Sequence, residues 1–347
     1  MLQLPVIPPP NYIIAEEARV RQNRLTKPAG SLGRLEDLSI QLASIQGTLH
    51  PDVSRKSVIV MAADHGVARE GVSAYPADVT RQMVMNFLQG GAAINVLARQ
   101  AGARICVVDM GVAADFPESL PIINARIDHG TRNMAEGPAM TRLQAEETIL
   151  RGMEIAEREF SRGVDILATG DMGIGNTTPS SAMTAVFTGL PVEQVTGRGT
   201  GIDDRGLAAK VAVIQKTIRV NRPDHKDPLD VLAKVGGFEI GGLAGLIIGS
   251  AARRVPVVVD GFISSTAALL ACEMLPDVRP YLIAAHCSVE IGHRAVLDKI
   301  GLEPLLDLRL RLGEGTGAAL AFHIIEASVR ILNEMATFED AGVSDRS

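Results

Sequence analysis

The chain has 347 residues, of which 46% are hydrophobic and 21% are charged, so it is long enough for one large domain or two modest ones with a substantial core. Its formal net charge is −6 and it has no long basic run, which argues against non-specific nucleic-acid binding. Glycine is abundant, with 34 residues, and tryptophan is absent, so we expect a core of aliphatic side chains and methionine.

The cysteines and the N-terminus indicate a cellular location. Cys106, Cys272 and Cys287 lie far apart without CxxC spacing, so reduced thiols are expected rather than a disulfide framework or a metal cluster. The proline-interrupted start MLQLPVIPPP lacks a basic region and does not predict a signal peptide. The most membrane-like stretch, GGLAGLIIGSAA, is shorter than the ~20 residues that a membrane span needs. We therefore expect a cytoplasmic protein that does not bind membranes.

The N-terminal segment is predicted to be an extended arm followed by a helix. Four prolines in the first ten residues exclude a helix there. Further on, Leu35, Leu38, Leu42 and Ile45 recur at helical spacing, and Gly47 is a plausible end of that helix.

Five short, continuous apolar runs then alternate with helical patterns, and each run ends at polar or glycine residues. Runs that are apolar at every position suit strands buried on both faces, and strand–helix alternation predicts a parallel sheet. In such sheets ligands bind at the carboxyl ends of the strands. The runs are SVIVMAA before Asp64, ICVV before Asp109, VDILAT before Gly170-Asp171, VPVVV before Asp260 and YLIAA before His286.

An irregular loop and a helix from about Thr80 follow the first strand. Ser73 and Tyr75 lie in the loop, and Gln82, Met83 and Phe87 on the helix could line a flat apolar pocket. A helix face that carries methionine is otherwise typical of plain core packing.

The segment GDMGIGNTT, residues 170–178, has a strand before it and a helix after it. Its glycines allow close backbone approach, and Asn176, Thr177 and Thr178 add donors at a helix N-terminus, which together favour an anion site. It has neither the Walker lysine nor the GxGxxG spacing. A tight turn with ordinary helix capping is the alternative.

A second glycine loop, GRGTGIDDRG (197–206), enters a helix with an apolar stripe at Leu207, Val211, Ile214 and Ile218. Lys210 flanks this stripe and could pair with a phosphate, whereas Lys216 points to the opposite side. A surface lysine with its stem on the apolar face remains the alternative.

The last third of the chain predicts two more helices. Gly241, Gly245 and Gly249 form a side-chain-free face that allows close approach of another backbone, and this apolar face is compatible with a dimer. A C-terminal helix with a stripe at Leu320, Ile324, Ala327 and Ile331 is expected to pack with the first helix. This divides the chain into a small helical domain, residues 1–50 plus 318–347, and a large parallel α/β domain, residues 51–317.

Seven motifs, in order, make the chain resemble the nicotinate-nucleotide–dimethylbenzimidazole phosphoribosyltransferases of cobalamin lower-ligand assembly. The resemblance covers nearly the whole chain. Each motif alone is weak, but their order is specific. The motifs are KPAGSLGRLEDL, ADHGVAREGVSAYP with VTRQMVMNFLQGGAAINVLAR, GDMGIGNTT, GTGIDDRGL, VVVDGFISS, AHCSVEIGH and LGEGTGAAL.

The resemblance implies a Rossmann-like parallel sheet, a homodimer, and transfer of phosphoribose from nicotinate mononucleotide to 5,6-dimethylbenzimidazole without a metal or cofactor. It implies that Glu314 is the general base and that Asp171 is a second acidic residue of the catalytic site. For the base it implies contacts from Ser73, Tyr75, Gln82, Met83, Phe87 and Leu312. For the nucleotide and its phosphate it implies contacts from Gly173, Gly175, Asn176, Thr177, Thr178, Gly199, Thr200, Gly201, Lys210, Asp260, Ser288 and Gly315.

Glu314 in the glycine turn LGEGTG has a chemical rationale within that reaction. As one benzimidazole nitrogen attacks, its partner nitrogen must lose a proton, and a carboxylate can accept it. Cleavage at C1′ builds oxocarbenium-like charge that an anion such as Asp171 could stabilise. The structural alternative for Glu314 is a helix N-terminal carboxylate favoured by the helix dipole.

Two other functions remain open from the residues alone. Asp64, His65, Asp109, Asp171, Asp260 and His286 all follow predicted strands, so a divalent-metal phosphohydrolase is one alternative. The other is a nucleotide-binding sensor without turnover.

Overall fold

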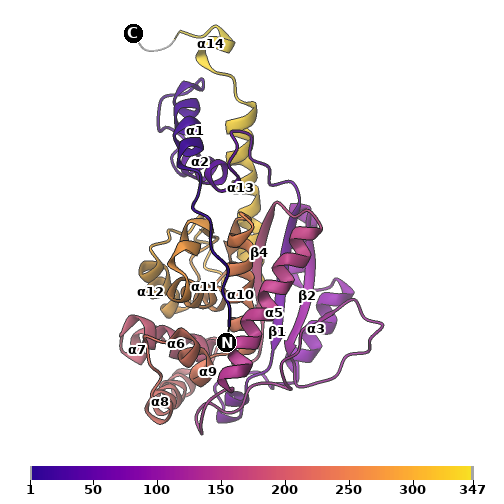
Figure 1. The fold of residues 1–347 in the computed structure, drawn as a ribbon. Coiled ribbons are helices and arrows are strands. Elements are labelled where there is room, and N and C mark those ends of the chain that lie inside the picture. The colour runs from indigo at the N-terminus through magenta and orange to yellow at the C-terminus, as the bar shows by residue number, and fades with distance from the viewer. Residues whose placement is uncertain (1, 345–347) are drawn as a thin grey trace.

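The computed structural model describes residues 2–344 and contains a six-stranded, all-parallel sheet flanked by helices, as the sequence predicts (Figure 1). The strand order is β3-β2-β1-β4-β5-β6. Strand β1 is buried along its whole length, which explains its continuous apolar run. The strands are β1 (Lys56–Ala63), β2 (Ala103–Gly111), β3 (Ile123–Asn124), β4 (Ile166–Met172), β5 (Val257–Val259) and β6 (Leu282–Ala284).

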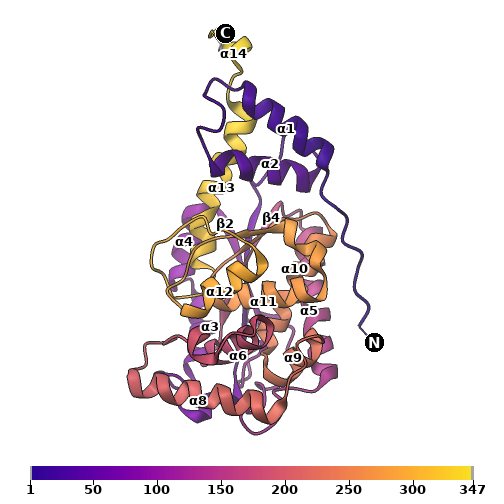
Figure 2. The ribbon, with the colours of Figure 1, turned by 90° about the vertical axis from the view of Figure 1, so that its left-hand side faces the viewer.

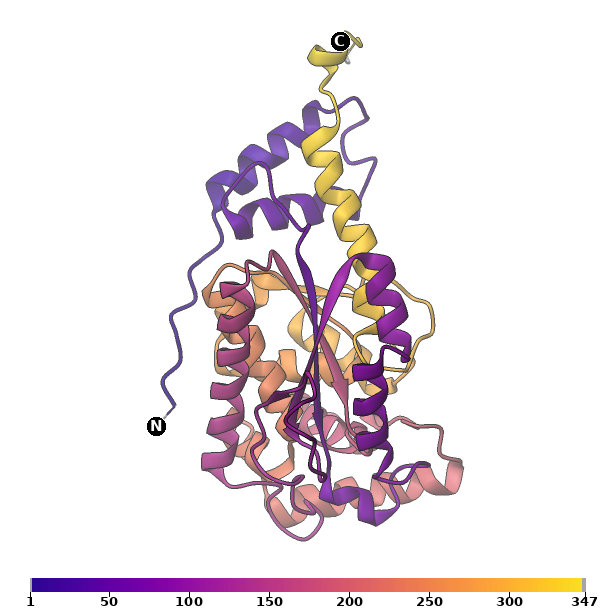
Figure 3. The same cartoon turned by 90° about the vertical axis from the view of Figure 1, so that its right-hand side faces the viewer.

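Helices cover both faces of the sheet (Figure 3). On one face α10 (Phe238–Ala252) contacts the strands and α5 (Arg142–Ser161) packs on α10, while α4 (Ala93–Ala101) and α13 (Thr316–Glu334) lie on the other face. Helix α3 (Val79–Gln89) packs on the same face as α4 and α13. At the carboxyl end of the sheet lie α6 (Thr177–Thr188), α7 (Val192–Val195), α8 (Asp204–Asn221) and α9 (Pro228–Val235). The remaining elements are α11 (Phe262–Met274), α12 (Ile291–Ile300), α14 (Phe338–Ala341) and two 3-10 helices, Gly66–Glu70 and Pro276–Tyr281.

The N-terminal helices and the end of the last long helix pack together at the pole opposite α6 and α8 (Figure 2). This lobe contains α1 (Tyr12–Arg24), α2 (Arg34–Gln46) and the C-terminal part of α13, with Ala18, Ala43 and Leu332 in one buried cluster. The N-terminal half of α13 packs on the sheet instead, since Phe322 shares a core cluster with Val58 of β1. Helix α13 therefore contributes to both parts, and the boundary at residue 317 stays a prediction.

The N-terminal arm and the first amphipathic helix agree with the sequence. Among the described residues no helix precedes Tyr12, and the arm is held where the Tyr281 hydroxyl donates to the Pro8 carbonyl at 2.7 Å. Helix α2 ends at Gly47, which has a left-handed φ of 69° and donates its N–H to the Ala43 carbonyl.

Helix α13 buries a different stripe from the predicted one. Residues Leu320, Ile324, Ala327 and Ile331 are only half-buried. The buried stripe lies one position away on the helix and includes Ala318, Phe322, Ile325, Val329 and Leu332. The small side chain of Ala318 lets the helix approach the sheet closely. The positions of the large apolar side chains therefore did not predict which face of this helix is buried.

Helix α8 also buries a different face. Only Ile214 of its predicted apolar stripe is fully buried, and the other members are half-buried. The buried face is centred on Lys210 and Thr217, whereas Lys216 is exposed on the opposite side as expected. Lys210 is thus an interior residue and not a surface lysine.

The glycine face of α10 is covered within the chain. A Cβ at Gly245 would lie 2.1 Å from the Ile149 carbonyl oxygen of α5, and one at Gly152 of α5 would lie 2.0 Å from the Gly242 carbonyl. The glycines therefore allow intramolecular contact of two helix backbones, and this face is not available to a second subunit. Within residues 2–344, no helix combines the length and apolar character that crossing a bilayer requires.

Candidate active site

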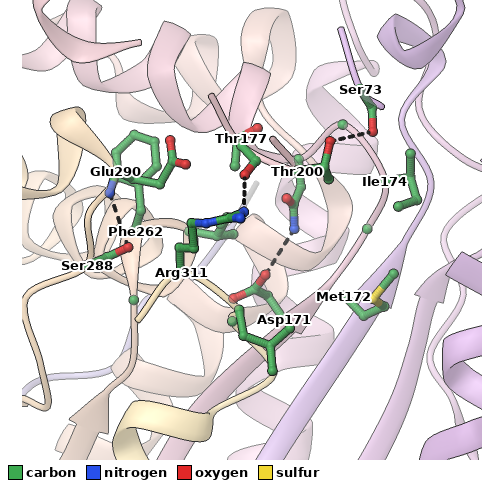
Figure 4. A pocket seen from close by; sticks show the side chains of 18 of the residues that line it. Ser73, Asp171, Met172, Ile174, Thr177, Thr200, Phe262, Ser288, Glu290 and Arg311 are labelled. Carbon is green, nitrogen blue, oxygen red and sulfur yellow. Dashed lines mark hydrogen bonds between the residues drawn. The ribbon is translucent and has the colours of Figure 1, made fainter. Parts of the chain in front are cut away.

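A cavity of about 270 Å³ lies at the carboxyl ends of β1, β4, β5 and β6, where the parallel sheet predicts a ligand (Figure 4). Its wall contains acidic, basic and apolar side chains. The lining residues come from within six segments: 72–75, 171–177, 199–200, 261–263, 286–290 and 311–313.

Asp171, at the end of β4, points into this cavity and is 5% exposed. One carboxylate oxygen, Oδ2, accepts a hydrogen bond from Asn176 Nδ2 at 3.0 Å, while Oδ1 is buried without a partner among the described residues. Burial, with the nearby Asp260 and Glu239 carboxylates, raises the pKa of Asp171 well above its usual value.

Glu314 occupies an unusual backbone position beside the cavity. Its φ is 64°, between the left-handed Gly313 and Gly315, and its N–H donates to the Asp171 carbonyl at 3.2 Å. A non-glycine residue in this conformation is costly and is held by its surroundings. Gly170 of β4 packs against it, since a Cβ there would lie 2.6 Å from the Glu314 carbonyl oxygen.

The Glu314 side chain is 4% exposed and has one oxygen, Oε2, without a partner in the described chain. Its neighbours Leu312 and Gly313 line the cavity, whereas Glu314 itself lies next to the wall. Burial raises the pKa of Glu314 to about 7, Asp260 adds to this effect, and a hydrogen bond from the Ile94 N–H opposes it. A carboxylate with a pKa near neutrality is suited to proton transfer.

Asp260 holds the Glu314 turn from behind. Its Oδ2 accepts from the Gly315 N–H at 3.2 Å and its Oδ1 accepts from the Ala318 N–H at 3.0 Å, so it caps the first turn of α13. Asp260 is fully buried and does not line the cavity. Its nucleotide-binding role stays a prediction, and these contacts favour a supporting role.

The first glycine loop and Lys210 meet on one side of the cavity. Gly173, Gly175, Asn176 and Thr177 line it, and the Lys210 Nζ donates to Thr177 Oγ1 at 2.7 Å. Burial lowers the pKa of Lys210 to about 8. A buried ammonium at a helix N-terminus is a strong anion-binding arrangement. Thr178, by contrast, is fully buried behind the wall.

The second glycine loop covers the same region. Gly199 and Thr200 line the cavity, while Gly201 is exposed. A Cβ at Gly199 would lie 2.8 Å from Thr177 Oγ1 and 3.2 Å from Lys210 Nζ, so the loop packs directly on the lysine–threonine pair.

The residues after β6 complete the far wall. Ser288 lines the cavity, and its N–H donates to His293 Nδ1 at 2.9 Å while its Oγ accepts from the Glu290 N–H at 3.3 Å. His293 Nε2 lies 2.9 Å from Ser265 Oγ. Since Nδ1 must accept, Nε2 carries the proton and donates to the serine, and burial lowers the pKa of His293 to about 3.

The six predicted base-binding residues do not all reach the cavity. Ser73, Tyr75 and Leu312 line it. Gln82 is exposed and donates to Asp78 Oδ2 at 2.7 Å. Two others belong to the core cluster on the α13 side of the sheet: Met83, half-buried, and Phe87, 3% exposed. For Phe87 this position favours core packing over contact with a ligand.

Several of the lining residues had no role in the sequence reasoning, among them Met172, Phe262, Glu290 and Arg311. Phe262 and Glu290 each follow a predicted strand within a few residues, so the strand-end rule could have found them. Met172 is the last residue of β4. Arg311 lies in a coil without a local pattern, and only the fold brings it to the site.

Some of the acidic and histidine residues at the strand ends lie close together, since His286 Nε2 lies 3.8 Å from Asp260 Oδ1, and others have partners elsewhere. Asp109 accepts from Arg126, and His65 Nε2 lies 2.8 Å from Glu239 Oε1. Across residues 2–344, no three histidine, cysteine, aspartate or glutamate side chains gather in a way that could hold a metal ion. The phosphohydrolase alternative therefore lacks a shared set of ligands in the described part of the chain.

An open parallel sheet with two glycine loops, a buried lysine and a buried carboxylate at its carboxyl edge is the arrangement of an enzyme that acts on a small phosphorylated substrate. The phosphoribosyltransferase family profile matches residues 7–343. A nicotinate-nucleotide–dimethylbenzimidazole phosphoribosyltransferase from Roseiflexus sp. (strain RS-1) is 60% identical over 332 residues, which cover 96% of this chain and 94% of that protein.

A second relative of the same name, from Geobacter sulfurreducens, is 58% identical and covers 95% of this chain and 94% of that protein. The crystal structure of CobT from Thermus thermophilus superposes with a TM-score of 0.92 at 47% identity, covering 96% of this chain and all of that one. The chain belongs to the nicotinate-nucleotide–dimethylbenzimidazole phosphoribosyltransferase family, and it is a phosphoribosyltransferase.

Proposed function

We propose that the chain transfers the 5-phosphoribosyl group of nicotinate mononucleotide to 5,6-dimethylbenzimidazole, giving α-ribazole 5′-phosphate and nicotinate, with Glu314 as general base. The observation that carries the mechanistic part is the buried Glu314 carboxylate, whose Oε2 has no partner in the described chain and whose pKa is about 7. The substrates are those in the names of the relatives.

The nucleotide side of the cavity is defined as Gly173–Thr177 with Gly199 and Lys210. We assign the 5′-phosphate to this side because Thr177 opens helix α6 and Lys210 supplies a buried positive charge. A phosphate there would accept from Lys210 Nζ, which donates to Thr177 Oγ1. Below a pH of about 8 the lysine is protonated and favours the anion.

The base side is defined as Ser73, Tyr75, Leu312 and Glu314. The acceptor ring would lie against Leu312 with one N–H directed to Glu314. The other ring nitrogen attacks C1′, the bond from C1′ to the pyridinium nitrogen breaks, and its electron pair neutralises the departing nicotinate ring. The proton of the attacking base passes to Glu314, so charge and atoms balance without an acid for the leaving group.

Asp171 is proposed to stabilise the positive charge that develops at C1′. Burial and the nearby carboxylates raise the pKa of Asp171. The positively charged pyridinium ring of the nucleotide would lower that pKa, because a nearby positive charge favours the carboxylate that stabilises it.

The reaction is tested by mixing the purified protein with chelator, nicotinate mononucleotide and dimethylbenzimidazole, and following nicotinate and α-ribazole phosphate by chromatography. Equal amounts of both products are expected. Nicotinate without the riboside would indicate a hydrolase, and a bound but unchanged nucleotide would indicate the sensor.

We also propose a homodimer and a cytoplasmic location. The N-terminal arm and α1 expose apolar side chains, since Val6 is 89%, Tyr12 70% and Ile13 73% exposed. Such a patch is typical of a subunit contact. A monomeric mass in light scattering at micromolar concentration would contradict the dimer.

A further inference from the structure

The short turn at Gly199–Thr200 contacts both sides of the active site. It lies between α7 and α8 without helical or strand structure, and Gly199 and Gly201 have positive φ values of 52° and 103°. The Gly201 N–H closes the turn by donating to the Arg198 carbonyl at 3.0 Å, and contacts from other segments add to this local bond.

Two distant segments hold this turn. Thr200 Oγ1 accepts from the Ala74 N–H at 2.9 Å and lies 3.2 Å from Ser73 Oγ. Arg311 Nη1 donates to the Gly199 carbonyl at 3.2 Å. Ser73, Thr200 and Arg311 all border the cavity, and the Ser73–Thr200 bond is drawn in Figure 4.

Both of these segments carry the base side. Ser73 accepts from the Tyr75 N–H at 3.2 Å, so the bond to Thr200 also fixes the start of the Tyr75 segment. Arg311 directly precedes Leu312 and the Glu314 turn. The contacts of Gly199 and Thr200 thus reach the two segments that would enclose the acceptor ring.

The opposite face of the turn contacts the nucleotide side. Gly199 packs on Thr177 Oγ1 and Lys210 Nζ, and the Gly199 N–H is bonded to the Glu290 carboxylate. An anion that draws Lys210 toward itself would therefore act directly on Gly199. The contacts form a continuous chain from Lys210 through Gly199 and Thr200 to Ser73 and Arg311.

We propose that Thr200 and Arg311 are positioning residues that couple the two substrates, so that nucleotide binding orders the base side and tightens acceptor binding. This inference rests on the proposed assignment of the two sides. By thermodynamic linkage the acceptor must tighten nucleotide binding by the same factor. With one or two hydrogen bonds carrying the coupling, a factor of about 5 to 30 is expected.

The test uses ribose 5-phosphate, which has the phosphoribosyl group but no leaving ring, so that binding is measured without turnover. Calorimetry gives the affinity of the full-length protein for dimethylbenzimidazole with and without saturating ribose 5-phosphate. Thr200→Val keeps the shape but removes the acceptor oxygen, and Thr200→Ser keeps the oxygen. We expect coupling in the wild type and in Thr200→Ser, and loss of coupling in Thr200→Val with ribose 5-phosphate affinity nearly unchanged.

Arg311→Met should weaken the coupling, and Arg309→Met is the matched control on an exposed arginine two residues away. If ribose 5-phosphate binds too weakly for calorimetry, the same coupling factor can be obtained from initial rates measured while the concentrations of both substrates are varied. The proposal is overturned if the wild type shows no coupling, if Thr200→Val retains it, or if Thr200→Val weakens ribose 5-phosphate alone, which would make Thr200 a direct phosphate ligand. Absence of α-ribazole phosphate from the wild type would instead refute the proposed function.

Discussion

The nucleotide side of the cavity is held by buried hydrogen bonds, whereas much of the base side is open to solvent. Lys210 is fully buried and bonded to Thr177, and Asp171 is bonded to Asn176. On the base side, Tyr75 and Leu312 are each 56% exposed. A preformed site loses little entropy when its ligand binds, while an open one must order its side chains. The difference suits an order in which the nucleotide binds to a finished site and the acceptor binds afterwards.

Glu314 is an exception on the base side, because it is buried and its backbone is held by neighbouring segments. Its backbone is held in the left-handed region by Gly170 and Asp171 of β4, and its carboxylate lies near the N–H of Ile94 at the start of α4. The proposed general base is thus held by contacts to the sheet, whereas Tyr75 and Leu312, which we propose to enclose the acceptor, lie on loops.

The largest expected effect is that of Glu314→Gln. Glutamine keeps the shape and can still accept from the Ile94 N–H, but it cannot take a proton at neutral pH. We expect kcat to fall about 10²- to 10⁴-fold with little change in nucleotide affinity, measured by the product assay and by calorimetry. A kcat close to that of the wild type would remove the base assignment.

Lys210→Met tests the preformed nucleotide side. Loss of a charge-assisted bond to the phosphate should raise the KM for nicotinate mononucleotide by about 10- to 100-fold while the KM for the acceptor changes less. Lys216→Met on the exposed face of α8 is the matched control and should behave like the wild type. Equal effects of the two variants would exclude Lys210 from phosphate binding.

The pH profile separates the two groups. Glu314 must be ionised to act as a base, so kcat/KM should rise as pH passes its pKa of about 7. Lys210 must be protonated to hold the phosphate, so nucleotide binding should weaken as pH passes its pKa of about 8. Each limb should approach a tenfold change per pH unit at its steepest. In Glu314→Gln the rise on the acidic side of the profile should be lost, and in Lys210→Met the fall on the basic side should be lost. If either change with pH persists in the corresponding variant, it is caused by another group.

The sequence predicted the sheet well because burial on both faces leaves a local trace. All five predicted apolar runs are strands, and the strand that was missed, β3, has only two residues and no run. The buried faces of α8 and α13 were predicted wrongly, because Lys210 and Ala318 are buried by contacts with other segments of the chain. Helical periodicity records which residues are apolar, and it does not record a lysine that is buried beside a loop.

Cavity-lining residues at strand ends leave a local trace in the sequence, and those placed by loop contacts do not. Asp171 follows the rule for parallel sheets, and seven ordered motifs identified the family that includes Glu314. Arg311 contacts the Gly199 carbonyl across 112 positions of the sequence, so no local pattern could reveal it. Phe87 lies in a core cluster and Met83 packs against it, and their contact with the base stays a prediction.

The smallest expected effect, that of Leu312→Ala, tests whether the base side forms only around its ligand. Because Leu312 is 56% exposed without ligand, its truncation should leave the melting temperature nearly unchanged. When the acceptor ring covers Leu312, the lost apolar contact should raise the KM for dimethylbenzimidazole by about 3- to 10-fold. Leu308→Ala is the control, because Leu308 is similarly exposed, at 54%, and does not line the cavity. A lowered melting temperature would mean that Leu312 already packs in the empty protein, and a raised KM for the nucleotide would move it to the other side of the cavity.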